Sequence, residues 1–288
     1  MAAVKKPRIA RHWLLMARHN AGKSTFAASM NPEYLTLDMD GRCSEQDLDE
    51  KSHVVTDSDP LKIIDRMESL RMKLMGRVGT VVVDSGTGVL DYIQARGRLM
   101  EQDARDRKEK FNKDNLNRMK ADTMRVLRLA ALKWHCDVLW IFHIEDGQYQ
   151  GENKERTTIS KTELERMKQN LTAILTIVQD KTGKRGIRIE WCRYNNNAAA
   201  GHIVWDEQGH WRGVPDLVAE FCENYKGTEG YNGKQYSSPW LLDFLKVRNV
   251  AFEDVDAMKK ELGITDEPAW YDRASWSRFI EKALPPKA

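Results

Sequence analysis

Residues 17–25, Ala-Arg-His-Asn-Ala-Gly-Lys-Ser-Thr, combine the groups that proteins use to hold phosphates. Such a loop needs converging backbone N–H groups, a lysine for the outer phosphates and a hydroxyl that ligates magnesium. Gly22 lets the backbone approach an anion, Lys23 supplies the ammonium and Ser24 the hydroxyl, whereas Ala17 replaces the glycine that usually begins the loop. The alternative is an ordinary turn with an exposed lysine. We expect a nucleotide to contact the whole loop: Ala17, Arg18, His19, Asn20, Ala21, Gly22, Lys23, Ser24 and Thr25.

Carboxylates follow two further apolar runs. The segment GRVGTVVVDSGTGVL (76–90) leads through β-branched residues to Asp84, and EYLTLDMDGR (33–42) ends in Asp38 and Asp40. At the carboxyl edge of a parallel sheet these side chains would face one cleft. Asp84 is then placed to hold magnesium together with Ser24, and one of the other two acids to orient water. The alternatives are a capping aspartate and a solvated turn.

A histidine ends another predicted strand. In CDVLWIFHIED (136–146), His143 and Glu145 alternate with apolar residues. A polar side chain at the end of a strand beside the metal strand could contact the outermost phosphate, although a histidine there could equally be a satisfied core residue. The site residues predicted to act in catalysis are thus Lys23, Asp40, Asp84 and His143.

The elements that must position these residues alternate between strands and helices, which favours an α/β fold with a mostly parallel sheet. The chain has 288 residues, 41% hydrophobic and 31% charged, which is typical of a globular protein. The net charge of +3 requires that any affinity for nucleic acid come from local patches. Four scattered cysteines, without a CxxC pair, favour a reducing compartment over structural zinc. We expect a cytoplasmic protein, in the bacterial host cytoplasm if phage-encoded, without membrane contact.

The motifs ARHNAGKST, LTLDMDG, TVVVDSGTG and LWIFHIED, in this order, resemble the RecA superfamily of ATPases. They are most similar to RecA-like nucleotide-binding proteins of bacteriophages, some of which are single-strand annealing proteins. The resemblance extends over about residues 8–205, including the strand-turn-strand pattern of 172–201. It implies a RecA-like core at 1–213, to which we add a helical extension at 214–288.

Several roles follow from the resemblance alone. It implies ATP and Mg²⁺ as ligands, with ATP hydrolysis. In the family an acid after the second strand activates water; Asp40 matches that position, where relatives commonly carry glutamate. Asp84 matches the acid of the metal strand, and His143 a polar sensor of the γ-phosphate. Arg193 resembles the basic residue that a neighbouring protomer inserts at the nucleotide, which implies a homo-oligomer, either a ring or a filament.

Three basic regions are candidate contacts to single-stranded DNA. In the family, loops matching 94–129 and 145–170 line the DNA path, and we expect the second region to begin as a polar loop. The segment QDKTGKRGIRIEW (179–191) predicts a basic β-hairpin. Salt-bridged helices, a surface loop and a solubilising turn are the alternatives. The predicted DNA contacts are Arg96, Arg98, Arg105, Arg107, Lys108, Lys154, Arg156, Lys184 and Arg185.

The favoured function is an ATP-dependent protein that acts on single-stranded DNA in phage recombination or replication. A single-strand-binding, replication or recombination protein could be its partner. Two alternatives remain open. One is a P-loop kinase of a nucleotide or small molecule, for which 94–120 could form a lid. The other is a non-hydrolysing module whose assembly is switched by nucleotide.

Overall fold

The computed structural model describes residues 10–41, 52–149 and 152–223 of the chain. Within these residues one mixed sheet contains nine strands in the order β3-β2-β4-β5-β1-β7-β8-β9, with β6 paired to β5. The strands β3, β2, β4, β5, β1 and β7 are mutually parallel, whereas β8 pairs antiparallel with β7, and β9 pairs antiparallel with β8. Their bounds are β1 His12–Ala17, β2 Tyr34–Asp38, β3 Ser52–Thr56, β4 Thr80–Asp84, β5 Asp137–Tyr149, β6 Glu152–Thr157, β7 Ala173–Gln179, β8 Arg185–Cys192 and β9 Ile203–Trp205.

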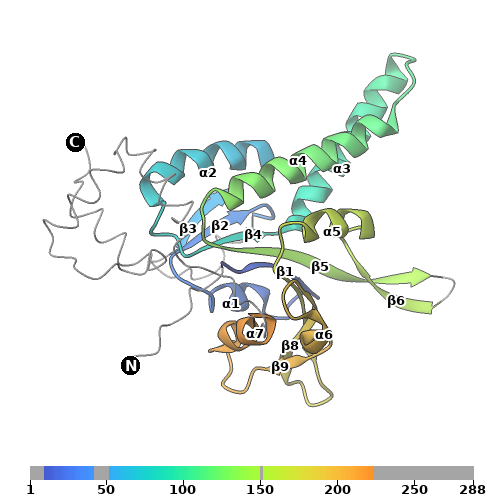
Figure 1. Cartoon of the computed structure of the whole chain (residues 1–288). Coiled ribbons are helices and arrows are strands. Elements are labelled where there is room, and N and C mark those ends of the chain that lie inside the picture. Colours follow the sequence, from blue (N-terminus) through green and yellow to red (C-terminus); the bar gives the residue numbers. More distant parts are fainter. Residues whose placement is uncertain (1–9, 42–51, 150–151, 224–288) are drawn as a thin grey trace, which may run out of the picture.

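Helices cover both faces of this sheet (Figure 1), which confirms the predicted α/β class. Helices α2, α3, α4 and α5 lie over one face, and α1, α6 and α7 over the other. Each face has its own buried apolar cluster. The central strands are apolar on both sides because helices exclude water from both. The helices are α1 Lys23–Ala27, α2 Pro60–Leu74, α3 Gly86–Asp106, α4 Lys113–Leu132, α5 Lys161–Lys168, α6 Asn196–Ala199 and α7 Val214–Glu223.

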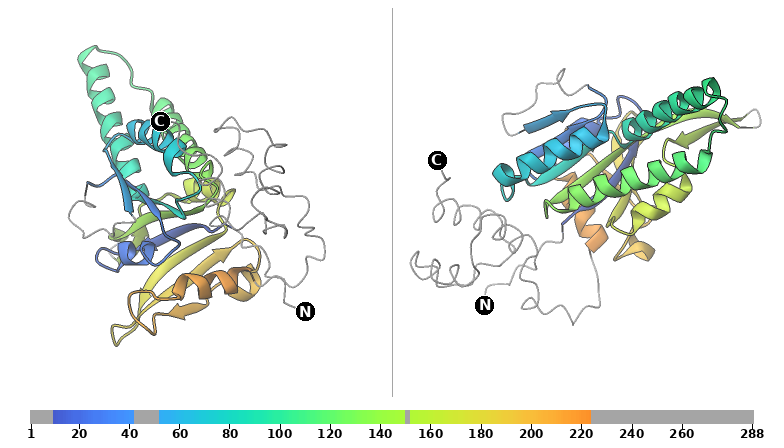
Figure 2. Two further views of the ribbon diagram at one scale, coloured as in Figure 1. Left: turned by 90° about the vertical axis from the view of Figure 1, so that its left-hand side faces the viewer. Right: turned by 90° about the horizontal axis from the view of Figure 1, so that it is seen from above.

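Helices α3 and α4 form a long hairpin that extends away from the sheet (Figures 1 and 2). The two helices pack closely at Gly97, where a Cβ atom would lie 2.5 Å from Leu116 Cδ1 and would force that side chain to shift. Ser85 caps α3 by accepting a hydrogen bond from the Gly88 N–H, and Asn112 caps α4 in the same way through Asp114. The predicted basic segment is therefore two ordered helices.

The segment after His143 is not the loop that we expected. Strand β5 continues to Tyr149 and pairs antiparallel with β6, from Ile144 opposite Thr157 to Tyr149 opposite Glu152. Between Ile144 and Tyr149, and along β6, the segment is polar and lacks the alternation that marks a half-buried strand, so its sequence indicated a loop. The hairpin extends beyond the sheet, where neither face needs an apolar side chain (Figure 1).

Of the predicted helical extension at 214–288, the structure describes only the first helix, α7. Helix α7 packs against the sheet through Val214, Val218 and Cys222. Asp216 on α7 forms an ion pair with the buried Arg11, which precedes β1. The remainder of the predicted helical extension, 224–288, lies outside the described residues. Among the described helices, none has the length and apolar composition needed to cross a bilayer.

Candidate functional site

The predicted phosphate loop lies between β1 and α1, at the carboxyl edge of the parallel strands. Ala17 is the last residue of β1, fully buried and paired with His143. The positive φ angles of this loop occur at Asn20 (58°) and Gly22 (92°), so position 17 is extended backbone that alanine adopts without strain. The replacement of glycine by Ala17 therefore leaves the backbone of the loop intact.

The ammonium group of Lys23 lies inside the loop. Its Nζ donates a hydrogen bond to the Arg18 carbonyl over 2.9 Å, and the residue is only 9% exposed. Arg18 itself forms an exposed ion pair with Asp146 of β5, with 2.9 Å between Nη2 and Oδ1. The lysine thus holds its charge at the centre of the loop, where an anion would be surrounded by amide donors.

Acidic residues from two strands meet beside this loop. Asp38 and Asp84 are register partners at the ends of β2 and β4. Asp40 follows β2, and its Oδ2 accepts a hydrogen bond from Ser85 Oγ over 3.0 Å. Gly88 makes room for this carboxylate, because a Cβ atom there would lie 2.4 Å from Asp40 Oδ1. Asp40 is therefore held at the amino terminus of α3, where the helix dipole stabilises a negative charge.

The carboxyl group of Asp84 holds its proton to a higher pH than an ordinary aspartate does, because its pKa is raised. Burial raises its pKa from 3.8 to about 6, and the nearby charge of Asp40 acts in the same direction. The ammonium of Lys23 acts in the opposite direction by stabilising the carboxylate. The site therefore collects more negative charge than its own lysine compensates, which suits a divalent cation.

His143 connects the phosphate loop to the acids. Its Nε2 lies 3.6 Å from Asp40 Oδ2, and its ring stacks on His19 of the loop with 4.5 Å between centroids. Its Nδ1 atom is buried and has no hydrogen-bond partner in the described part of the chain. A buried ring nitrogen of this kind is usually satisfied by an ordered water.

The predicted inter-subunit arginine lies away from the loop of its own subunit. Arg193 follows β8 at the opposite edge of the sheet from the phosphate loop, and its guanidinium donates to the carbonyls of Lys168, Gln169 and Leu171. It therefore ties the end of α5 to the sheet. A role at the nucleotide of a neighbouring subunit stays a prediction.

The predicted DNA contacts fall on three separate surfaces. Five lie on or just after α3, where Arg105 pairs with Glu101 and Arg107 with Glu109. Lys154 and Arg156 belong to β6. Lys184 precedes β8, with Nζ 2.7 Å from both carboxylate oxygens of Glu207. The α3 residues in this set are Arg96, Arg98 and Arg105, followed by Arg107 and Lys108.

Two residues that contact the loop were assigned no such role from the sequence. Trp211 is fully buried and donates its indole N–H to the Gly22 carbonyl over 3.0 Å. Arg185, predicted as a DNA contact, lies against the same glycine. Trp211 is 189 residues from its partner, so local patterns carry no signal of the contact. In the local sequence, the only feature that singles out Trp211 is its place between the two glycines of GHWRG (209–213).

Replacing Gly22 by alanine should weaken both the loop and its ligand binding. The φ angle of 92° is one that side chains rarely adopt, and the new Cβ would lie 3.2 Å from the anchored Trp211 Nε1. We expect a loss of about 1–2 kcal/mol in unfolding free energy and at least a tenfold weaker nucleotide affinity. Chemical denaturation and calorimetric titration measure the two effects. Gly209→Ala is the control, because that glycine also has a positive φ (74°) but no atom near its Cβ position. Equal nucleotide affinity in both variants would contradict the prediction.

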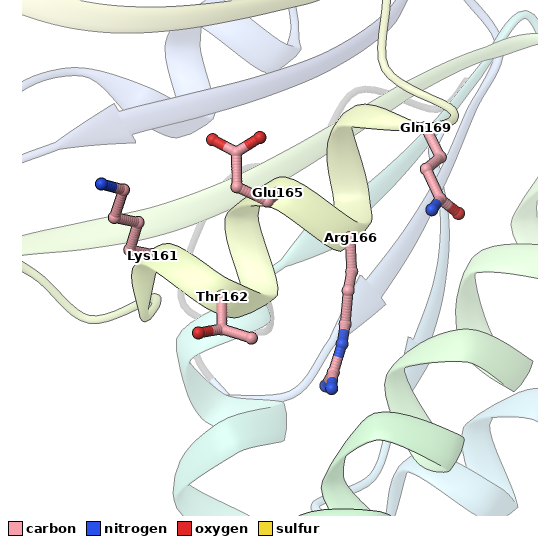
Figure 3. Close-up of a pocket in the computed structure, with 5 residues that line it drawn as sticks. All are labelled: Lys161, Thr162, Glu165, Arg166 and Gln169. Carbon is pink, nitrogen blue, oxygen red and sulfur yellow. The ribbon is translucent and has the colours of Figure 1, made fainter.

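A hollow of 460 Å³ along α5 is not part of this site (Figure 3). It is lined by residues of that helix and its end, and the side chains of Lys161 and Glu165 point away from those of Thr162 and Arg166. The residues lining it are Lys161, Thr162, Glu165, Arg166 and Gln169.

The residues fit a magnesium nucleotide. The left-handed Gly22 and the enclosed lysine form a cradle for phosphates, with Asp84 beside it. No group of three or more His, Cys, Asp or Glu side chains in the described ranges could hold a metal by itself. Magnesium bound with a nucleotide needs only one or two carboxylates, because phosphate oxygens complete its shell.

Comparison with known proteins identifies a family. Residues 10–195 match the family AAA_24, described as an AAA domain. No curated protein matches the chain in sequence. Among solved structures, the crystal structure of the RadB recombinase is similar with a TM-score of 0.41 and 16% identity, covering 68% of this chain and 87% of that one. Because the family model spans well over half of the sequence and includes the phosphate loop, the chain belongs to the AAA_24 family and contains a P-loop ATPase domain.

Proposed function

We propose that this protein hydrolyses ATP with magnesium and couples the nucleotide to binding of single-stranded DNA, in recombination or replication. The observation that carries the ATPase part is the convergence of Lys23, Asp84, Asp40 and His143 at one edge of the sheet. Four segments of sequence far apart in the chain supply these groups. A role for a phage, and assembly into a ring or filament, belong to the same proposal.

Each residue has a role that follows from its position. Loop amides and Lys23 hold the phosphates, while Ser24 and Asp84 hold the metal. Bound magnesium would neutralise charge on the outer phosphates. Asp40 orients and accepts a proton from the attacking water, with its own oxygen fixed by Ser85.

His143 couples this chemistry to the loop. Its Nε2 faces Asp40 and its ring lies on His19, so a change at the outer phosphate alters the contacts of both. The donor groups are positioned before the nucleotide arrives, which is how sites of this kind lower the barrier.

The surface that best supports DNA binding is the α3–α4 hairpin. Segment 94–120 carries nine lysines and arginines against five acids. Arg98 and Lys108 are exposed on it. The ion pairs of Arg105 and Arg107 are exposed and contribute little, so phosphates can replace their carboxylate partners.

ATP turnover should therefore rise when single-stranded DNA is added. We expect stimulation of about tenfold or more, because isolated subunits of such ATPases lack full charge stabilisation. Phosphate release with and without an oligonucleotide measures it, and electron microscopy of the same samples shows any ring or filament. The double variant Arg98→Glu, Lys108→Glu should abolish the stimulation. It should also make the slope of log affinity against log salt concentration shallower by about 0.7 for each DNA phosphate that is no longer neutralised.

The control for this experiment lies on α2. Lys62→Glu with Lys73→Glu makes the same change of charge at two exposed positions. It should retain stimulation and most of its DNA affinity. Equal reductions of DNA affinity and stimulation in both double variants would mean that the effect depends on net charge alone and not on the α3–α4 hairpin. If instead the wild type transferred phosphate to a nucleotide acceptor and ignored DNA, the kinase alternative would replace this proposal.

A further inference from the structure

Arg185 lies next to the phosphate loop of its own subunit. A Cβ atom at Gly22 would lie 2.5 Å from Arg185 Nη1, so the guanidinium touches the backbone of the loop immediately before Lys23. Strand β8 begins at Arg185 and runs antiparallel to β7, whose last residue is Gln179. This topology returns the chain to the carboxyl edge of the parallel strands, where the phosphate loop also lies.

Trp211 holds the guanidinium in this position. The Arg185 Cζ atom lies 5.2 Å from the centre of the Trp211 ring, a cation–π distance. The same indole donates to the Gly22 carbonyl and packs edge-on against Phe26 of α1 at 5.7 Å. The backbone N–H of Trp211 donates to the Asp206 carboxylate, and the backbone N–H of Asp206 donates to the Arg185 carbonyl. Arginine, tryptophan and loop are thus locked into one arrangement.

The charge of Arg185 is available to a ligand. The neighbouring Lys184 is paired with Glu207, whereas no carboxylate in the described ranges forms an ion pair with Arg185. The guanidinium is partly exposed, and its stacking on a ring leaves the N–H groups along its edge free to donate. A planar, permanently charged fork beside converging amides is the arrangement that recognises phosphate oxygens.

We propose that Arg185 binds the phosphates of the nucleotide in the same subunit, with Trp211 as its platform, and is not a DNA contact. This inference rests on the proposed function, since it requires that the loop bind a nucleotide. Within a single subunit, it adds a second cation to that of Lys23. Nucleotide binding then requires no neighbour to supply the second charge.

Calorimetric titration with ADP tests the inference on the full-length protein. Arg185→Ala should raise the Kd about tenfold to hundredfold, the value of a hydrogen bond to a charged group. Arg185→Lys should recover part of the affinity, because it restores the charge but not the fork. Lys184→Ala is the matched control and should stay within about twofold of the wild type. Binding of a fluorescent oligonucleotide without nucleotide should be the same for wild type and Arg185→Ala.

Thermal unfolding separates a ligand contact from a purely structural one. If Arg185 contacts the ligand, its removal reduces the increase in Tm that ADP causes. If Arg185 only stabilises the fold, its removal lowers the Tm without ADP and leaves that increase unchanged. The inference is overturned if both Arg185→Ala and Arg185→Gln lower the Tm without ADP but leave the ADP-induced increase in Tm unchanged. It is also overturned if Arg185→Ala weakens DNA binding while its ADP affinity stays intact. If wild type and Lys23→Ala both fail to bind ADP, the proposed function falls first. If only Lys23→Ala fails and Arg185→Ala binds normally, the inference about Arg185 alone is wrong.

Discussion

Replacing Lys23 by alanine is expected to lower ATP turnover by at least about 10²-fold, the usual cost of removing a preorganised charge from a reaction centre. The ammonium is enclosed by the loop and is held by the Arg18 carbonyl, so its charge is fixed where the phosphates are expected to bind. Nucleotide affinity should fall with it, because the lysine contacts phosphates in the ground state as well. Phosphate release and ADP titration measure the two effects.

The companion variant Asp40→Ala separates binding from hydrolysis. It should retain ADP affinity within about threefold while turnover falls as far as in Lys23→Ala, because in the proposed mechanism Asp40 acts on water and not on the nucleotide. If Asp40→Ala loses turnover yet keeps nucleotide-dependent DNA binding at full strength, nucleotide acts as a switch of assembly. Turnover above a third of the wild-type rate in Lys23→Ala would contradict the assignment of the loop itself.

Asp84→Asn is expected to abolish turnover and, at the same time, to stabilise the nucleotide-free protein. Turnover falls because the neutral amide is a poor magnesium ligand. Stability rises because burial and Asp40 make the Asp84 carboxylate costly, as its pKa of about 6 records. A pKa raised by about two units corresponds to at most about 3 kcal/mol at neutral pH. Urea unfolding in the presence of a chelator, together with phosphate release, tests both effects.

The stability advantage of Asp84→Asn over the wild type should grow as the pH rises. Between pH 3.8 and about 6 the folded protein binds more protons at Asp84 than the unfolded chain does. The contribution of this group to stability therefore falls as pH rises through that window and is constant above it. Asparagine lacks the effect, so the advantage of Asp84→Asn should be small at about pH 4.5 and largest at about pH 7–8. A wild type that is the more stable protein at about pH 8 would exclude this account.

The strand ends that form the site could be predicted because each follows a run of apolar residues. The apolar run that precedes the phosphate loop forms strand β1, and the acids at the ends of β2 and β4 meet as alternation and parallel pairing require. The phosphate loop was recognisable from its lysine and glycine despite Ala17, since the first position is extended and needs no glycine.

The contacts that could not be predicted are those between distant segments. The position of Trp211 under the loop depends on how β9 and the turn after it pack, and no spacing in the sequence encodes that. Arg185 occurs in the basic segment 179–191, whose composition is equally compatible with binding to DNA phosphates and to ATP phosphates. The β5–β6 hairpin was mistaken for a loop because both of its faces are polar. Burial patterns reveal only those strands that bury a face.

Helix α3 connects the reaction centre directly to the outer end of the hairpin. Its capping residue, Ser85, is bonded to the Asp84 backbone and also touches Asp40, and the helix then runs without interruption to Asp106. A 21-residue helix is a stiff rod about 30 Å long. A tilt of a few degrees at the Ser85 end thus moves the far tip by about an ångström or more. If the proposed hydrolysis displaces Ser85, helix α3 would carry that displacement to the outer end of the α3–α4 hairpin.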